Sequence, residues 1–462
     1  MPEPTARPDD ASFRDPDSQV VHVDGRVLRR LSEAGWRDWE ALSRAGFFER
    51  AVAGGRLVAT TELSSGTGAD DGWYGVLEHE RVPFVTYPFE WTFGMLASAT
   101  IVHLELLRES LEEGLTTKDG YAYNVQWRGV EPVFIDVSSF TPYTGGPWAG
   151  YRQFCETFLN PLMLQSFVGV DFQPWLRGRL EGIPVRDMRR LLSARHLLRP
   201  GVLRHVVLHA HFDRSAREAT SSTRSALAQA GFDRDVVLAT VNKLLGLVQQ
   251  LSWRPDPSPW TSYRASNTYS GEDRSTKLAF AAKVASSLRP QLVWDLGCND
   301  GSHAKAVADH AGLVVAIDGD HATAELLYRS LRATRVRNVL PLVVDLTDPS
   351  PSLGWRNRER PGLLERPRPD LVLCLALLHH LTIAGNIPLA QVVEWLAGLA
   401  PVAVVEFVDR TDPMVSQLLA NKPVAHTDYS RARFEHEVAR HYRVEAREEL
   451  SSGTRTLYAL KR

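Results

Sequence analysis

The stretch from Asp295 to Gly301 contains the residues best suited to hold a nucleotide-like cofactor. It reads Asp-Leu-Gly-Cys-Asn-Asp-Gly and lies between a short apolar run, 292–296, and a segment with helical spacing. Gly297 and Gly301 let the backbone turn sharply and approach a ligand without a side-chain clash. The helix that follows would point its first amide groups at the same place. The sequence therefore predicts a ligand-binding loop, with Asp295, Gly297, Asn299 and Gly301 at the ligand.

Two further acidic residues stand at the ends of the next apolar runs. Asp318 follows 313–317, about 20 residues after the loop, where a carboxylate would accept hydrogen bonds from ribose hydroxyls. Asp345 follows 339–344, a position that resembles the one where methyltransferases commonly have an acid near the adenine amine, unless it only forms a turn. A nicotinamide dinucleotide and S-adenosylmethionine (SAM) both fit these features. Asn299 stands between the two glycines, so the third glycine of the dinucleotide fingerprint is absent. Asp345 and the antiparallel hairpin expected at the end of the chain favour SAM, because a dinucleotide fold would more often continue with parallel βα units.

Candidate catalytic residues follow the fourth and fifth apolar runs. His379 and His380 come after 371–375, and a histidine there could deprotonate a hydroxyl or amine of the substrate. The alternative is that they only shape the cofactor pocket or cap a helix. Glu406 lies near the end of the run 402–407, and we predict a pocket carboxylate that touches the substrate.

Two residues before the first strand are also candidates for the cofactor site. Tyr269 belongs to a segment that we expect to fold over the cofactor. Lys277 could pair with a ligand carboxylate, although a solvated helix lysine is the favoured interpretation.

Apolar runs and helical segments alternate through the C-terminal part, which is typical of βαβ units in a parallel sheet. The runs 443–449 and 454–460, joined by Ser-Ser-Gly, predict an antiparallel hairpin at the end. A Pro-rich stretch, 253–260, predicts a linker between this part, 261–462, and an N-terminal α+β domain over 21–252. Residues 1–20 are polar and Pro/Asp-rich, and we expect a disordered lead-in.

Residues 260–462 resemble a class I SAM-dependent methyltransferase. The motif Asp295–Gly301, Asp318, Asp345 and the segment His379-His380-Leu381 follow in that family's order and spacing. The resemblance implies a Rossmann-like sheet with a C-terminal antiparallel hairpin, SAM as the cofactor, and methyl transfer. The Asn-Asp-Gly form of the loop also occurs in sugar C-methyltransferases.

The N-terminal half carries two further resemblances. Its segment Asp-Gly-Tyr-Ala-Tyr-Asn-Val-Gln-Trp resembles bacterial two-part methyltransferases related to nodulation-type proteins. The spacing of Asp119, Asn124 and Asp136 resembles the catalytic loop and metal-binding Asp of kinase-like and aminoglycoside-phosphotransferase-like folds. No glycine-rich phosphate loop is present and no lysine precedes Lys118, so the resemblance implies a degenerate domain that binds substrate or a partner. A locally similar hairpin in an unrelated α+β domain is the alternative.

The bulk composition limits the partners. The chain has 462 residues, 44% of them hydrophobic, and a net charge of −2, which is typical of a globular protein rather than a nucleic-acid binder. Its three cysteines are widely separated, which predicts neither a disulfide framework nor a metal site. No apolar signal segment or membrane span is evident, so we expect a cytoplasmic protein with a small-molecule substrate, such as a sugar or secondary metabolite, and no membrane partner.

Three functions remain open from the sequence: a methyltransferase, a SAM- or nucleotide-binding protein without turnover, and a nicotinamide oxidoreductase. The acceptor atom (O, N or C) and the oligomeric state are not predicted.

Overall fold

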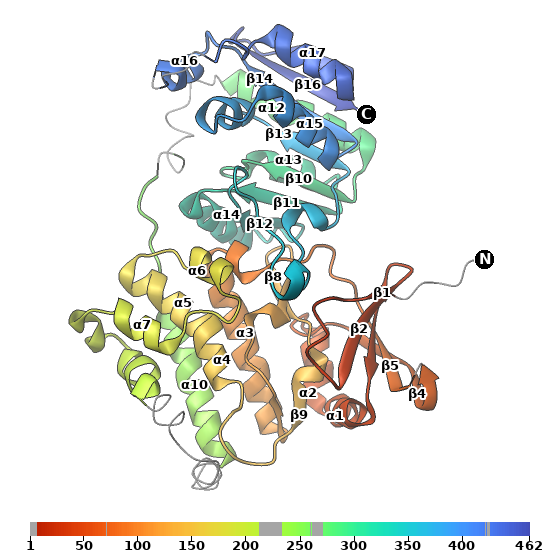
Figure 1. The fold of residues 1–462 in the computed structure, drawn as a ribbon, viewed down its shortest axis with the longest axis vertical. Helices are drawn as coiled ribbons and strands as arrows, with labels where there is room; N and C mark the ends of the chain where they lie inside the picture. Colours follow the sequence, from red (N-terminus) through yellow and green to blue (C-terminus); the bar gives the residue numbers. More distant parts are fainter. Residues whose placement is uncertain are drawn as a thin grey trace. The chain divides into compact units, whose positions relative to one another are not determined.

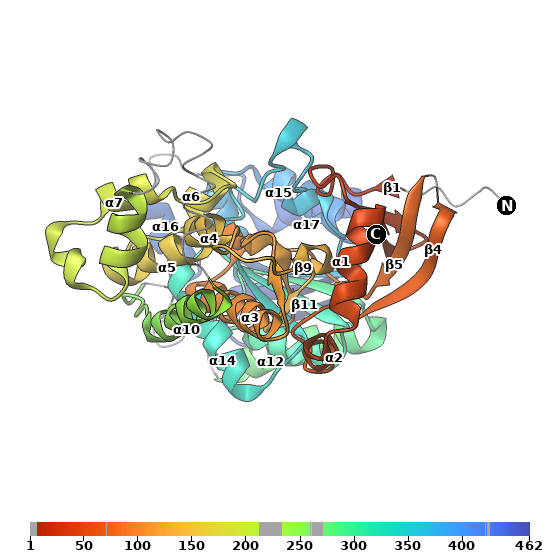
Figure 2. The same ribbon diagram turned by 90° about the horizontal axis from the view of Figure 1, so that it is seen from below.

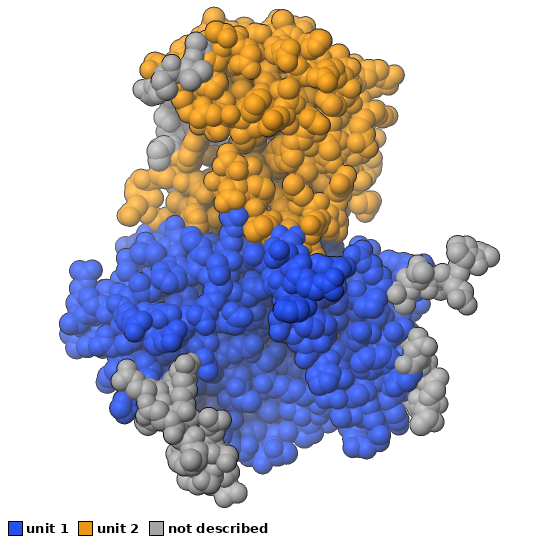
Figure 3. All heavy atoms as spheres, in the orientation of Figure 1, with its two compact units in different colours: residues 1–127, 132–254, 352–360 blue, residues 128–131, 255–351, 361–462 orange. Residues whose placement is uncertain are grey.

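A computed structural model describes residues 7–70, 72–211, 233–258, 260, 271–420, 422 and 426–462. The chain forms two compact units, coloured separately in Figure 3. Unit 1 comprises residues 1–127, 132–254 and 352–360, and unit 2 comprises residues 128–131, 255–351 and 361–462. The division after residue 254 falls within the expected linker, but each unit also takes a short segment from elsewhere in the chain.

Unit 2 contains a seven-stranded sheet in the order β12-β11-β10-β13-β14-β16-β15. The five strands β10 to β14 pair in parallel, whereas β16 runs antiparallel to both of its neighbours. The strands are β10 (Leu292–Leu296), β11 (Leu313–Asp318), β12 (Val339–Val343), β13 (Leu371–Cys374), β14 (Val402–Val408), β15 (Arg443–Glu449) and β16 (Arg455–Lys461). This is the sheet of the class I methyltransferase fold, so the prediction of the fold class is confirmed.

The burial of these strands explains why their sequences are uniformly apolar. Every residue of β10, β13 and β14 is buried, as expected for parallel strands covered on both faces. The edge strand β15 is exposed at every residue and carries alternating charges, which discourage pairing with another chain. The helices are α12 (Gly271–Leu288), α13 (Ser302–Ala308), α14 (His321–Thr334), α15 (Leu389–Leu399), α16 (Pro413–Ala420) and α17 (Arg431–His441), with the short segments η9 (Leu363–Glu365) and η10 (His380–Ala384) (Figure 1).

Unit 1 begins with a five-stranded antiparallel sheet in the order β1-β2-β3-β5-β4. Its strands are β1 (Arg7–Pro8), β2 (Ser18–Val23), β3 (Arg26–Leu31), β4 (Thr60–Asp70) and β5 (Trp73–His79). Asp24 and Gly25, both with positive φ, form the two-residue turn between β2 and β3, a turn that favours Asp-Gly. The helices α1 (Glu33–Ser43) and α2 (Gly46–Ala53) lie between β3 and β4 in the sequence.

The remainder of unit 1 is mostly helical. Two long helices, α3 (Phe93–Glu112) and α10 (Arg234–Gln250), pack side by side, as Figures 1 and 2 both show. Two small two-stranded sheets follow α3: β6 (Leu115–Thr117) pairs with β9 (Phe140–Pro142), and between them in the sequence β7 (Val125–Arg128) pairs with β8 (Glu131–Phe134). The other elements are η1 (Pro88–Glu90), η2 (Ala122–Asn124), η3 (Val137–Ser139), α4 (Tyr151–Phe154), η4 (Cys155–Leu159), α5 (Asn160–Met163), η5 (Leu164–Val168), α6 (Gln173–Gly178), α7 (Val185–Leu191), η6 (Ala194–Leu198), η7 (Val202–Leu208) and η8 (Trp355–Asn357).

The structure differs from the expected disordered lead-in over residues 1–20. From Arg7 onward the chain is ordered: β1 pairs with β2, and Asp9 N donates to Val20 O at 2.8 Å. Ser18 is buried, and its hydroxyl accepts a hydrogen bond from Arg29. The pairing of β2 with β1 and β3 orders this polar segment, and pairing partners cannot be identified from local composition.

Among the helices of the described residues, none is both long and apolar enough to cross a bilayer.

Candidate functional site

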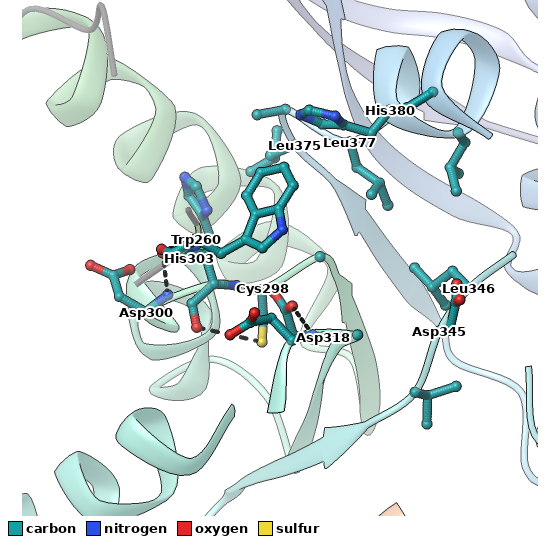
Figure 4. Close-up of a pocket in the computed structure, with 18 of the residues that line it drawn as sticks. Trp260, Cys298, Asp300, His303, Asp318, Asp345, Leu346, Leu375, Leu377 and His380 are labelled. Atoms are coloured by element: carbon teal, nitrogen blue, oxygen red, sulfur yellow. Dashed lines mark hydrogen bonds between the residues drawn. The ribbon is translucent and has the colours of Figure 1, made fainter. Parts of the chain in front are cut away.

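A cavity of about 560 Å³ opens where the parallel strands of unit 2 end. The strand order reverses between β10 and β13, so the loops after these two strands diverge and leave a crevice at the carboxyl edge of the sheet. The volume is within the range of small-molecule sites. Residues from the loops after β10, β11, β12 and β13 line it: Gly297, Cys298, Asn299, Asp300, Asp318, Gly319, Asp320, Asp345, Leu346, Thr347, Leu375, Ala376, Leu377 and His380 among them (Figure 4).

The glycine loop follows β10 and has left-handed backbone at three residues. Gly297, Asn299 and Gly301 have φ values of +67°, +47° and +69°. A Cβ atom on Gly301 would lie 2.5 Å from Leu327 Cδ1, so this position has little room for a side chain. Asparagine tolerates left-handed backbone better than most residues, which explains how Asn299 can occupy the position between the two glycines where a third glycine would otherwise fit.

Asp318, the last residue of β11, both orders the loop and lines the cavity. Its Oδ2 accepts a hydrogen bond from Asn299 N at 2.8 Å, and its Oδ1 accepts one from Asp320 N at 2.9 Å. Burial raises the pKa of the carboxyl above its ordinary value, against the effect of these amides. The position fits the expected partner of ribose hydroxyls.

Asp345 and Asp295 take different positions. Asp345 lines the cavity, is exposed, and accepts hydrogen bonds from Thr347 N at 2.8 Å and Thr347 Oγ1 at 2.7 Å, so it also forms the turn weighed from the sequence. Asp295 is buried behind the loop and is not among the lining residues. Burial raises its pKa to about 8, and its Oδ2 has no hydrogen-bond partner among the described residues. Asp295 is therefore not among the side chains that would touch a ligand in the cavity.

The two adjacent histidines do not share one environment. His380 lines the cavity, and its ring lies edge-on to Trp260 at 5.0 Å between centroids. Burial lowers the pKa of His380 to about 4, so its imidazole is neutral at pH 7. His379 is fully buried beneath it and lies outside the cavity lining. Of the pair, the structure brings His380 to the site.

Glu406, predicted from the sequence to touch the substrate, is instead the centre of a buried ion-pair network. Its carboxylate lies 2.6 Å from Lys277 Nζ and 3.3 Å from Arg455 Nη1, and it accepts a hydrogen bond from Ala376 N at 2.8 Å. Arg455 in turn pairs with Asp412 at 2.8 Å. Although burial opposes ionisation, the two cations hold the pKa of Glu406 below its ordinary value. Glu406 does not line the cavity; it supports the loop at Ala376, which does.

The structure adds residues that the sequence did not single out. Arg274, one helical turn before Lys277 on α12, lines the cavity and forms no ion pair with a carboxylate of the described residues. His303, in the first turn of α13, lines it as well, and burial lowers its pKa to about 3. Figure 4 shows Trp260 and His303 on one side of the view of the cavity and Asp345 and Leu346 on the other. His303 follows Gly301 by two residues, and that spacing is the signal that could have identified it.

Tyr269, the remaining cofactor candidate, lies outside the described residues.

In unit 1 the structure brings together the three residues of the kinase-like spacing. Asn124 Nδ2 donates to both carboxylate oxygens of Asp119 at 3.1 Å and lies 3.4 Å from Asp136 Oδ2. Asp136 also pairs with the buried Arg29 of β3 at 3.0 Å. Burial and the charge of Asp136 raise the pKa of Asp119 to about 6. Arg29 thus neutralises one carboxylate, a pairing that sequence spacing could not reveal.

A search of known proteins finds a relative that spans the whole molecule. The nodulation protein NoeA of Rhizobium meliloti (strain 1021) is 36% identical over 457 residues, which cover 98% of this chain and 95% of the relative. The chain belongs to the NoeA family. This result confirms the resemblance to nodulation-type proteins, and no family model matches the sequence.

Two solved structures are each similar to less than half of the chain. Magnesium protoporphyrin IX methyltransferase (ChlM) from Synechocystis PCC 6803, with bound SAH, is 17% identical over 44% of this chain and 93% of that chain, with a TM-score of 0.32. The N-methyltransferase NodS from Bradyrhizobium japonicum WM9 is 10% identical over 41% of this chain and 97% of that chain, with a TM-score of 0.31.

Proposed function

We propose that this NoeA-family chain transfers a methyl group from SAM to a small-molecule acceptor. The observation that carries the proposal is Asp318, which lines a cavity at the strand-order reversal directly beside the left-handed glycine loop. The antiparallel β16 next to β14 favours a methyltransferase over a nicotinamide oxidoreductase, whose sheet would continue in parallel.

The residues present fit SAM. Asp318 would accept hydrogen bonds from the ribose hydroxyls, and the backbone of Gly297, which lines the cavity, would approach the ligand without a side chain in the way. Asp345 and Leu346 would border the adenine, and Arg274 would pair with the methionine carboxylate. When bound, SAM supplies a methyl group on a sulfonium, which is already strongly electrophilic.

The chain's own contribution is then to orient the acceptor and exclude water. Methyl transfer is an in-line displacement, so alignment of the attacking atom accounts for most of the catalytic effect that the protein can supply. Leu375, Leu377 and Leu381 make one wall of the cavity apolar. His303 and His380 are neutral at pH 7 because burial lowers their pKa values, so either can accept a hydrogen bond from an acceptor O–H or N–H. The acceptor class that we propose is a sugar or secondary metabolite, methylated at O, N or C.

Equilibrium binding tests the cofactor. We expect the full chain to bind S-adenosylhomocysteine (SAH) at one site per chain by isothermal titration calorimetry, with no heat from NAD. NAD binding without SAH binding would overturn the proposal. The acceptor is then sought with methyl-labelled SAM in small-molecule extracts, where the purified protein should produce a labelled product.

Replacing Arg274 by Met should weaken SAH binding by about 10- to 100-fold, because a hydrogen bond between charged groups contributes about 1.5–3 kcal/mol. Binding of 5′-methylthioadenosine, which has no amino-acid group, should not change. Lys283→Met, an exposed position on the same helix, is the matched control and should bind both ligands normally. Equal losses for both ligands in Arg274→Met would contradict the assignment.

Replacing His380 by Asn should lower kcat by about 100-fold or more, the size expected for loss of a proton acceptor. SAH affinity should stay within about threefold of the parent protein, because the proposed role of His380 is toward the acceptor rather than the cofactor. His310→Asn, outside the cavity, should behave like the parent protein. A normal kcat for His380→Asn would contradict this role for His380. His303 would then be the candidate proton acceptor, and His303→Asn would test it.

A further inference from the structure

The segment that follows α6 in unit 1 is strongly basic although the whole chain is nearly neutral. Residues 186–211 contain six arginines and one acidic residue, Asp187, whereas the chain as a whole has a net charge of −2. The segment includes η6 and η7, drawn in yellow-green beside α7 in Figure 1.

Leucines on these two short helices face water. In η7 the side chains of Val202, His205 and Val206 are buried, whereas Leu203 is 57% exposed and Leu208 is 45% exposed. In η6, Leu198 is 92% exposed. Helix η7 thus buries Val202 and Val206 but leaves two leucines exposed, and η6, whose only buried residue is His196, leaves Leu198 exposed. Large exposed apolar side chains that gather in one segment often mark an interaction surface.

The arginines among these leucines have no acidic partner in the part of the chain that the structure describes. Arg204 forms no hydrogen bond or ion pair among the described residues, Arg195 contacts only the ring of His196, and Arg199 lies over the ring of Phe167. Elsewhere on the surface arginines pair with carboxylates, as Arg26 does with Glu78 and Arg431 with Glu449. We call Arg195, Leu198, Arg199, Leu203, Arg204 and Leu208 the Leu/Arg face.

We propose that the Leu/Arg face docks onto an anionic lipid surface. Guanidinium groups form bidentate hydrogen bonds with lipid phosphates. Leucines that lie between the arginines can insert at the boundary between the headgroups and the acyl chains. A nucleic acid would satisfy the arginines but not the leucines, and the large exposed apolar side chains of this segment are leucines rather than the aromatics that stack on bases. From the sequence we expected no membrane partner, and this surface departs from that expectation. The proposal does not depend on the proposed methyl transfer.

Co-sedimentation of the full chain with vesicles tests the proposal. We expect binding to vesicles that contain 30% phosphatidylglycerol, and little binding to vesicles of phosphatidylcholine alone. Because each basic residue near an anionic surface contributes about a factor of five, Arg195→Gln/Arg199→Gln/Arg204→Gln should lower the partition coefficient by about 100-fold. Leu198→Ser/Leu203→Ser/Leu208→Ser should also release the protein. Arg37→Gln/Arg44→Gln/Arg443→Gln, at exposed positions elsewhere, is the matched control and should bind like the parent protein.

Each variant should retain the SAH affinity and melting temperature of the parent protein, which excludes misfolding. The proposal is overturned by equal binding to both vesicle types, by no binding, or by binding unaffected in both triple variants. Binding to a 30-base-pair duplex in place of vesicles would assign the face to nucleic acid. If the protein does not bind vesicles but its molecular mass in solution rises with concentration, and the leucine variant abolishes that rise, the Leu/Arg face would be assigned to a second copy of the chain.

Discussion

Replacing Asp318 by Ala should weaken SAH binding by about 100-fold or more, the largest effect that we expect from one change at the cavity. The side chain would lose hydrogen bonds to the ribose, each about 1.5–3 kcal/mol for a charged acceptor. It would also release Asn299 N, which it holds at 2.8 Å, so the loop itself would lose its order. Calorimetric titration with SAH measures the loss.

Asp345→Ala is the matched control for this prediction. Asp345 also lines the cavity, but it is exposed and its hydrogen bonds run to Thr347 within its own turn. We expect a loss of about tenfold or less, since a hydrogen bond at an exposed site contributes little. An Asp318→Ala variant that is folded and binds SAH like the parent protein would remove the basis for the proposed SAM site.

The raised pKa of Asp318 predicts that SAH affinity depends on pH. Burial raises the pKa of Asp318, so its carboxylate becomes protonated at a higher pH than an ordinary aspartate does. A protonated carboxyl can no longer accept hydrogen bonds at both oxygens. SAH affinity should therefore be constant at neutral pH and fall as the pH drops through that raised pKa, and the Asp318→Ala variant should lack this dependence.

Replacing Glu406 by Gln should destabilise unit 2 by about 3–5 kcal/mol, because it leaves two buried cations without their shared carboxylate. Lys277 and Arg455 are both at least 95% buried, so water cannot replace the lost partner. Differential scanning calorimetry of the full chain measures the shift in the transition of unit 2. Lys277→Met combined with Glu406→Gln should cost less than the sum of the two single changes, since one unpaired charge is removed.

The control is Glu449→Gln on the exposed strand β15. Glu449 pairs with Arg431 and Arg447 in contact with solvent, and such pairs contribute at most about 1 kcal/mol.

The stability that Glu406 contributes should also depend on pH. Despite burial, Lys277 and Arg455 hold the pKa of Glu406 below its unfolded value. The stabilisation is therefore complete at neutral pH and is lost as the pH falls through the folded pKa. A Glu406→Gln variant with normal stability but no turnover would restore the catalytic role expected from the sequence.

The sequence by itself determined the elements that build the cavity. Each of the signals is local. The glycines at 297 and 301 indicate a backbone turn, the apolar runs of strand length indicate strands buried on both faces of a sheet, and the acids mark the ends of those strands. They predicted β10 and β15 at the observed boundaries, the final hairpin, and the places of Asp318 and Asp345 in the site.

Only the tertiary structure decided which side chains face the cavity and which are paired away from it. His379 and His380 are adjacent in sequence, yet the side chain of His379 is buried in the core whereas that of His380 lines the cavity. Lys277, Glu406 and Arg455 come from α12, β14 and β16, so their mutual neutralisation appears only when these elements pack. Long-range pairing also ordered β1 and β2 in a segment whose composition indicates disorder. Ion pairs and strand pairs join residues that are far apart in the chain. The periodicity of one segment therefore cannot predict which residues pair.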